Sequence, residues 1–249
     1  MEFLSQPNLP EKRVSAVVVD YRTPQEIRAA LAARQIRIIE SCAVSALDES
    51  VRGHSDMMLV HIGGARFVCA PEAKAHFSRQ LCGMGAQIIT GESPLGCTYP
   101  KNAAYNIARF NRYAFHRLDI TDAKLHSVLQ CEGVQWIHTA QGYSKCNVCM
   151  ISSDALITSD VSIARAARSV GIDTLQIEAG HIRLPGYDYG FIGGATGLID
   201  AGVLAVAGSL RFHPDKASIA AFCHKHGVRL DCLTEQVPLD IGSILPICC

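Results

Sequence analysis

The sequence has 249 residues, with 23 basic and 23 acidic side chains and a hydrophobic share of 49%. A neutral chain this rich in apolar residues is not intrinsically disordered, and it lacks the basic excess typical of nucleic-acid-binding proteins. The length fits one large domain or two small ones, with enough residues for a sizeable buried core.

Eleven cysteines are spread irregularly from Cys42 to Cys249. The first seven residues lack the basic and apolar regions of a signal peptide, and no stretch of about 18 apolar residues occurs. We therefore expect a cytoplasmic protein without a membrane partner, in which the thiols are reduced and most of them are buried.

The predicted elements repeat five times in the same order: apolar strand, amphipathic helix, apolar strand, polar loop. Helix starts are indicated by a proline or a capping side chain at Pro24, Pro71, Asp122, Asp160 and Pro214. Helix ends are indicated at Gln35, Gly85, Gly133, Gly171 and Gly227, on average about 48 residues apart. Four of these five are glycines, as a left-handed helix cap favours.

Tight turns join the last strand of one repeat to the first strand of the next. Met57–Val60 and Arg66–Ala70, for example, flank the turn residues Gly63 and Gly64. The pattern predicts five ββαβ-type units in a single domain, covering approximately residues 13–60, 61–108, 109–151, 152–199 and 200–249. Five such units around an axis leave little exposed sheet edge. A doubly wound nucleotide-binding sheet is the less favoured alternative, because helices would then separate successive strands.

This arrangement resembles the pentein fold, the fivefold β/α-propeller of guanidino-group-modifying enzymes, over residues from about 14 to 247. That superfamily also includes a noncatalytic ribosome anti-association factor. Three stretches, Gln141–Asn147, Leu184–Gly197 and Pro238–Pro246, resemble an uncharacterised bacterial family of the same fold. The resemblance implies an α/β propeller with a central cavity.

The resemblance also implies that the central polar residues come from the loop after the second strand of each unit. In this sequence those loops are rich in tyrosines, acids and amides. Converging polar groups on a rigid scaffold are typical of a site for a small-molecule ligand. The predicted ligand-binding residues are Tyr99, Asn102, Tyr143, Asn147, Tyr187, Asp188, Tyr189, Asp240 and Ser243.

In the pentein enzymes a cysteine thiolate attacks the guanidinium carbon, a histidine moves protons and carboxylates hold the cation. Cys146 is the best candidate for the thiol, because the adjacent Lys145 would lower its pKa. His54 is the best-placed proton carrier. Three acids are candidates for the carboxylates, with Asp56 counted among the catalytic residues: Asp56, Asp188 and Asp240.

The sequence departs from the enzyme pattern in its last unit. The position of the family nucleophile falls near Pro246, and Cys248 and Cys249 follow too late. Two functions are therefore open: a hydrolase of guanidino or amidino compounds with a displaced nucleophile, or a noncatalytic ligand-binding or protein-interaction member of the fold. Simpler roles also fit the residues: Cys146 as an inward-packed residue at a strand start, His54 bonded to nearby backbone, and the three aspartates as turn caps.

Two further motifs are weak. Cys146 and Cys149 form a single CxxC pair, and strand alternation would place them on opposite faces, so no metal is expected. Gly193–Gly197 lacks the Lys-Ser/Thr ending of a phosphate loop and fits a glycine-rich strand where backbones approach closely. We expect no cofactor and no nucleic-acid partner, and the oligomeric state is left open.

Overall fold

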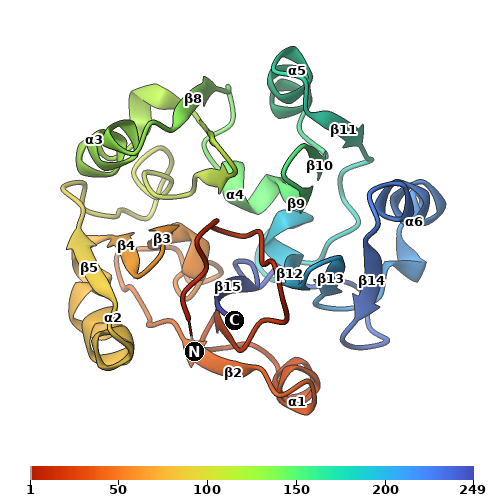
Figure 1. The fold of residues 1–249 in the computed structure, drawn as a ribbon, viewed down its shortest axis with the longest axis horizontal. Helices are drawn as coiled ribbons and strands as arrows, with labels where there is room; N and C mark the ends of the chain where they lie inside the picture. Colours follow the sequence, from red (N-terminus) through yellow and green to blue (C-terminus); the bar gives the residue numbers. More distant parts are fainter. Residues whose placement is uncertain (1) are drawn as a thin grey trace.

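The computed structural model describes residues 2–249, which form five three-stranded sheets arranged around a common axis (Figure 1). In sheet order they are β15-β1-β2, β3-β4-β5, β6-β7-β8, β11-β10-β9 and β12-β13-β14. The strands are β1 (Ala16–Val19), β2 (Arg37–Glu40), β3 (Leu59–Gly63), β4 (Arg66–Cys69), β5 (Gln87–Thr90), β6 (Ala108–Phe110), β7 (Tyr113–His116), β8 (Gln135–His138), β9 (Cys149–Ser152), β10 (Ala155–Thr158), β11 (Asp173–Gln176), β12 (Thr196–Asp200), β13 (Val203–Val206), β14 (Arg229–Cys232) and β15 (Leu245–Cys248).

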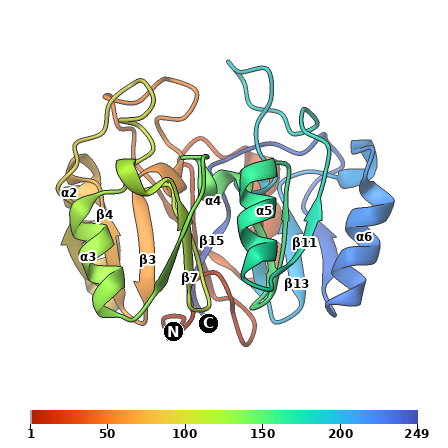
Figure 2. The same ribbon diagram turned by 90° about the horizontal axis from the view of Figure 1, so that it is seen from above.

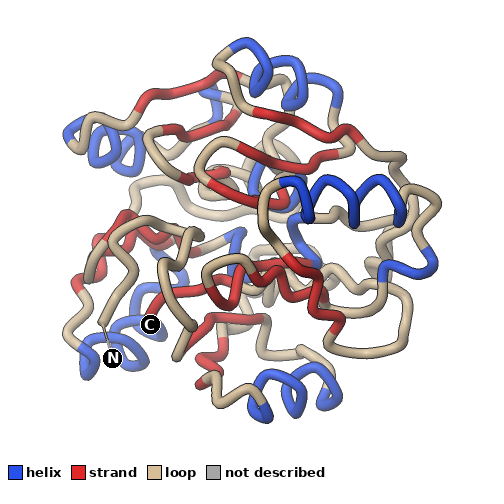
Figure 3. Tube along the Cα trace, turned by 45° about the vertical axis from the view of Figure 1, so that its right-hand side comes forward, coloured by secondary structure: helices blue, strands red, loops and turns tan. Residues whose placement is uncertain are grey.

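Every sheet is built in the same way. Two strands pair antiparallel, and the middle strand leads through a helix into a third strand parallel to it, as in β3, β4 and β5. The connecting helices lie on the outside of the ring (Figure 1; helices blue in Figure 3). They are α1 (Gln25–Ala33), α2 (Lys74–Leu81), α3 (Ala123–Cys131), α5 (Val161–Ser169) and α6 (Lys216–Lys225). The predicted fivefold β/α-propeller is confirmed, and the doubly wound alternative is wrong because five separate sheets replace one continuous sheet.

The sequence analysis expected each hairpin to join one unit to the next, and this expectation is wrong. Both strands of each hairpin exchange hydrogen bonds within one sheet, so the expected division at residues 60 and 61 falls inside β3. The first sheet obtains its innermost strand from the far end of the sequence (Figure 1), since β15 pairs antiparallel with β1 and sets Cys248 opposite Ala16. This pairing closes the ring.

Local signals place the helices where the sequence predicts them. The side chains of Asp122 and Asp160 cap α3 and α5, each accepting a hydrogen bond from a backbone N–H of the first turn. All five predicted helix ends have a positive φ, including the non-glycine Gln35 at 60°. The left-handed residue that follows each helix fixes where it ends, and therefore where the next strand and its loop begin.

The core follows from the apolar strands and from one face of each helix. Strands β1, β4, β7, β10 and β13 lie in the middle of their sheets and are buried almost throughout. The loops that follow the third strand of each sheet gather at one end of the ring, and the two termini lie at the other end (Figure 2). None of the helices in residues 2–249 combines the length and apolar character needed to cross a membrane.

Candidate functional site

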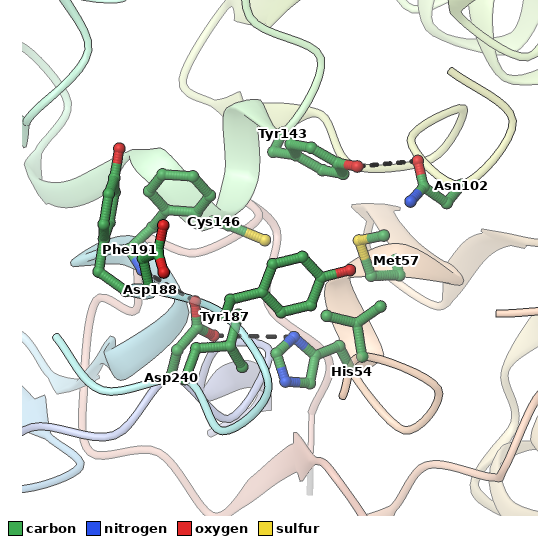
Figure 4. A pocket seen from close by; sticks show the side chains of 12 residues that line it. His54, Met57, Asn102, Tyr143, Cys146, Tyr187, Asp188, Phe191 and Asp240 are labelled. Carbon is green, nitrogen blue, oxygen red and sulfur yellow. Dashed lines mark hydrogen bonds and ion pairs between the residues drawn. The ribbon is translucent and has the colours of Figure 1, made fainter. Parts of the chain in front are cut away.

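A cavity of about 240 Å³ lies on the ring axis at the loop end (Figure 4). Its wall includes residues from all five loops that follow the parallel strand after a connecting helix. These are the loops that the sequence analysis placed after the second strand of each unit. The lining residues are Val51, His54, Met57, Asn102, Tyr143, Cys146, Leu184, Tyr187, Asp188, Tyr189, Phe191 and Asp240. Four predicted site residues do not line it, namely Asp56, Tyr99, Asn147 and Ser243.

Cys146 lies in α4 (Ser144–Asn147), a single helical turn before β9, and not at a strand start. Its Sγ donates a hydrogen bond to Oδ2 of Asp56 over 3.3 Å. Asn106 binds the residue from the other side, because its Nδ2 lies 2.9 Å from Sγ and its Oδ1 accepts the Cys146 N–H at 3.1 Å. The thiol is therefore fixed in position by two buried polar partners.

The low pKa of Cys146 that was expected from the adjacent Lys145 is not found. Burial, Asp56 and Asp240 together raise the pKa of the thiol well above its ordinary value. The Nζ of Lys145 donates a hydrogen bond to Oγ of Ser243 at 2.9 Å. The ammonium is itself buried, which lowers the pKa of Lys145.

Asp56 and Ser243 form a buried layer beneath the cavity. The Ser243 hydroxyl donates a hydrogen bond to Oδ2 of Asp56 at 2.6 Å, and Ser243 adopts a left-handed φ of 74° that turns it toward this layer. A chain of contacts thus runs from Lys145 through Ser243 and Asp56 to Cys146. Burial raises the pKa of the Asp56 carboxyl.

Asp240 forms part of the cavity wall. Its two carboxylate oxygens accept backbone N–H groups from Phe191 at 2.9 Å and Gly242 at 3.0 Å. Burial nevertheless raises the pKa of Asp240 to about 6. A Cβ at Gly194 would lie 2.0 Å from Oδ1 of Asp240. The expected close approach is therefore real, although Gly193–Ala195 form a 3-10 turn and the strand begins only at Thr196.

The imidazole of His54 lies between two carboxylates. Nδ1 is 3.7 Å from Oδ1 of Asp240, and Nε2 is 4.0 Å from Oδ2 of Asp20. Burial lowers the pKa of His54, so the ring is neutral near pH 7. Asp20 is paired with Arg22 at 2.7 Å, which neutralises one of the two acids.

Aromatic side chains form the upper wall. The hydroxyl of Tyr143 donates a hydrogen bond to Oδ1 of Asn102 at 3.0 Å, while Tyr187 and Tyr189 are 49% and 40% exposed at the mouth. Tyr99 stands outside this wall, with its ring 5.6 Å from that of Tyr143.

The other predicted residue outside the cavity is Asn147. Its side-chain amide donates a hydrogen bond to the backbone carbonyl of Tyr143 at 3.1 Å, so it supports the loop.

Two polar residues of the site, Asn106 and Asp20, were not predicted from the sequence. Each lies next to a short apolar strand, Asp20 directly after β1 and Asn106 shortly before β6. A polar side chain beside a buried strand was the available signal, since buried polar groups need partners.

No group of three or more His, Cys, Asp or Glu side chains in residues 2–249 is arranged to hold a metal ion. Cys149, the second member of the CxxC pair, begins β9, and burial raises the pKa of its thiol to about 11.

The sequence matches the model of a family of unknown function, DUF6873, over residues 18–245. The match spans most of the chain, so the protein belongs to this family. A search of the curated proteins finds no match. The expected membership of an uncharacterised family is thereby confirmed.

Solved structures of guanidino-group-modifying enzymes share the fold. DDAH from Pseudomonas aeruginosa, in complex with citrulline, has a TM-score of 0.59 at 7% identity and covers 90% of this chain and 93% of its own. Inosamine-phosphate amidinotransferase from Streptomyces griseus has a TM-score of 0.58 at 9% identity, and the match covers 94% of this chain and 92% of the amidinotransferase chain. Agmatine deiminase from C. jejuni with substrate bound has a TM-score of 0.58 at 8% identity, and the match covers 98% of this chain and 96% of the deiminase chain. These similarities establish the pentein fold.

Proposed function

We propose that this member of the family binds a small guanidino or amidino cation in the central cavity and hydrolyses one of its C–N bonds, with Cys146 as the nucleophile. The observation that carries the proposal is the common lining of one cavity by the Cys146 thiol and the carboxylates of Asp188 and Asp240. The guanidino-modifying activities of the structural neighbours support the same substrate class.

Recognition of the cation rests on charge and shape. A planar delocalised cation pairs well with carboxylates, and aromatic rings such as Tyr143, Tyr187 and Phe191 attract it through their faces. The carboxylate of Asp240 is already positioned by two backbone N–H groups, so little reorganisation accompanies binding.

The chemical step begins from a protonated thiol. A bound cation beside Cys146 favours the thiolate, and Asp56 accepts the Sγ proton along the existing hydrogen bond. The S–C bond forms, a C–N bond breaks, and the proton passes to the leaving nitrogen to release ammonia. Water then attacks the thiouronium carbon, which releases a ureido product and restores the thiol. His54 is the group we assign to accept a proton from that water.

The proposal is tested with a panel of guanidino and amidino compounds, following ammonia release and ureido formation. Wild-type protein should turn over at least one compound, and Cys146→Ser should not. Cys149→Ser is the matched control, because Cys149 is buried beside the same loop but does not line the cavity. Equal turnover by wild type and Cys146→Ser would exclude this thiol as the nucleophile.

A noncatalytic ligand-binding protein on the same scaffold is the second candidate. The raised pKa of Cys146 favours it, since a protonated thiol is a poor nucleophile. Saturable binding of a guanidino compound without turnover would select this function, whereas no binding of any compound would contradict both candidates.

A further inference from the structure

The cavity has acidic groups on its wall and no basic ones. Asp188 and Asp240 line it, and no lysine or arginine in residues 2–249 does. The remaining polar groups are neutral amide, hydroxyl and thiol groups and the His54 imidazole, whose lowered pKa keeps it uncharged near pH 7. An anionic group inside this cavity would therefore find no charged partner.

Three cations around the site are bound to groups outside the cavity. The Lys145 ammonium binds Ser243 in the layer beneath the cavity and faces a separate, smaller space of about 20 Å³. The Arg22 guanidinium is bonded to both carboxylate oxygens of Asp20, at 3.1 and 2.7 Å. Arg117 binds Asp119. Moving any of them toward a ligand would break an existing pair.

The wall carries instead a large apolar surface. Val51, Met57, Leu184 and Phe191 line it together with the tyrosine rings. A carboxylate or phosphate placed there would lose its hydration and would be repelled by the two aspartates. An alkyl or aryl group would gain from burial against the same surface.

We propose that the ligand is a guanidino or amidino compound whose remaining part is uncharged and apolar, and that compounds with a carboxylate or phosphate are rejected. This inference rests on the proposed function, because it specifies the substrate class of the same cavity. Selectivity of this kind arises from repulsion and unpaired charge as much as from new attraction.

The test compares compounds that differ by one anionic group, using isothermal titration calorimetry on wild-type protein. The pairs are butylguanidine against 4-guanidinobutanoate, and pentylguanidine against 5-guanidinopentanoate. In each pair the member without the carboxylate should bind at least about tenfold more tightly, and added salt should reduce the difference. Binding of the two members within about twofold would overturn the inference and leave the proposed function standing. If none of the four compounds binds, the proposed function fails as well.

A charge-reversal variant gives a second readout. Asp188 is exposed at the mouth, so Asp188→Lys should fold, and it should shift the preference toward 4-guanidinobutanoate by about tenfold or more. Asp154→Lys is the matched control, since it makes the same charge change in the β9–β10 turn at the other end of the ring. An equal shift in both variants, or none in Asp188→Lys, would overturn the inference.

Discussion

The thiol of Cys146 on the cavity wall and the carboxylate of Asp56 beneath it are hydrogen bonded over 3.3 Å, and both side chains are buried. The carboxylate holds the thiol proton and opposes the thiolate charge, so the thiol ionises only at high pH while the cavity is empty. The same carboxylate is the nearest acceptor for that proton once a cation enters. The pair thus links the protonation state of the thiol to occupation of the cavity.

Replacement of Asp56 by asparagine should make the thiol more acidic. Asp56→Asn removes a buried negative charge next to Sγ, so the pH profile of Cys146 alkylation by iodoacetamide should move to lower pH by about 1 unit or more. The rate is measured on the Cys146 peptide by mass spectrometry. Cys149 is an internal control, because burial is the main cause of its raised pKa.

Two results would contradict this prediction. One is a pH profile of alkylation for wild-type Cys146 that lies at lower pH than the profile of an ordinary thiol. The other is a profile in Asp56→Asn that does not differ from wild type.

Affinity for a cation should depend on pH through Asp240. The pKa of its carboxyl is about 6, so the carboxylate is charged at pH 7.5 and protonated at pH 5. Affinity for butylguanidine, measured by calorimetry from pH 5 to 8, should therefore fall as the pH decreases through about 6. Protonation of His54 on acidification would act in the same direction, because an imidazolium repels the ligand.

The variant Asp240→Asn should bind more weakly and show little pH dependence near 6. A wild-type affinity that is constant from pH 5 to 8, or that rises on acidification, would exclude Asp240 as the cation's partner.

Gly194 should be indispensable to the position of Asp240. In Gly194→Ala the new methyl group would lie 2.0 Å from Oδ1, so either the carboxylate or the backbone must move. The free energy of unfolding should fall by about 1–3 kcal/mol, as urea titration would measure, and butylguanidine affinity should fall with it. Gly83→Ala is the control, because a Cβ there meets no atom within 4 Å and φ is not positive. Equal stability of the two variants would contradict the close contact.

The architecture was predictable because its signals are local. The caps at Asp122 and Asp160 and the left-handed helix ends are properties of short segments, and their repetition specifies five equivalent sheets. Once the sheets form a ring, the loops after the third strands must meet at one end. Convergence of His54, Cys146 and Asp240 follows from that geometry.

The electrostatics of the site were not predictable in the same way. Lys145 adjoins Cys146 in sequence, but successive residues of a helical turn do not face each other. The groups that control the thiol are Asp56 and Asn106, which are separated from it by 90 and 40 residues. The packing of different sheets decides which polar side chains come into contact. Short sequence patterns do not contain this information.

The pairing of β15 with β1 also has a consequence for synthesis of the protein on the ribosome. Until residues 245–248 emerge, the apolar strand Ala16–Val19 has an unpaired edge, and such edges promote association between nascent chains. The loop carrying Asp240 leads directly into β15, so the carboxylate reaches His54 only in the final closing contact between opposite ends of the sequence. Contacts between residues so far apart in sequence form slowly. A ligand that touches both residues would stabilise the newly closed ring.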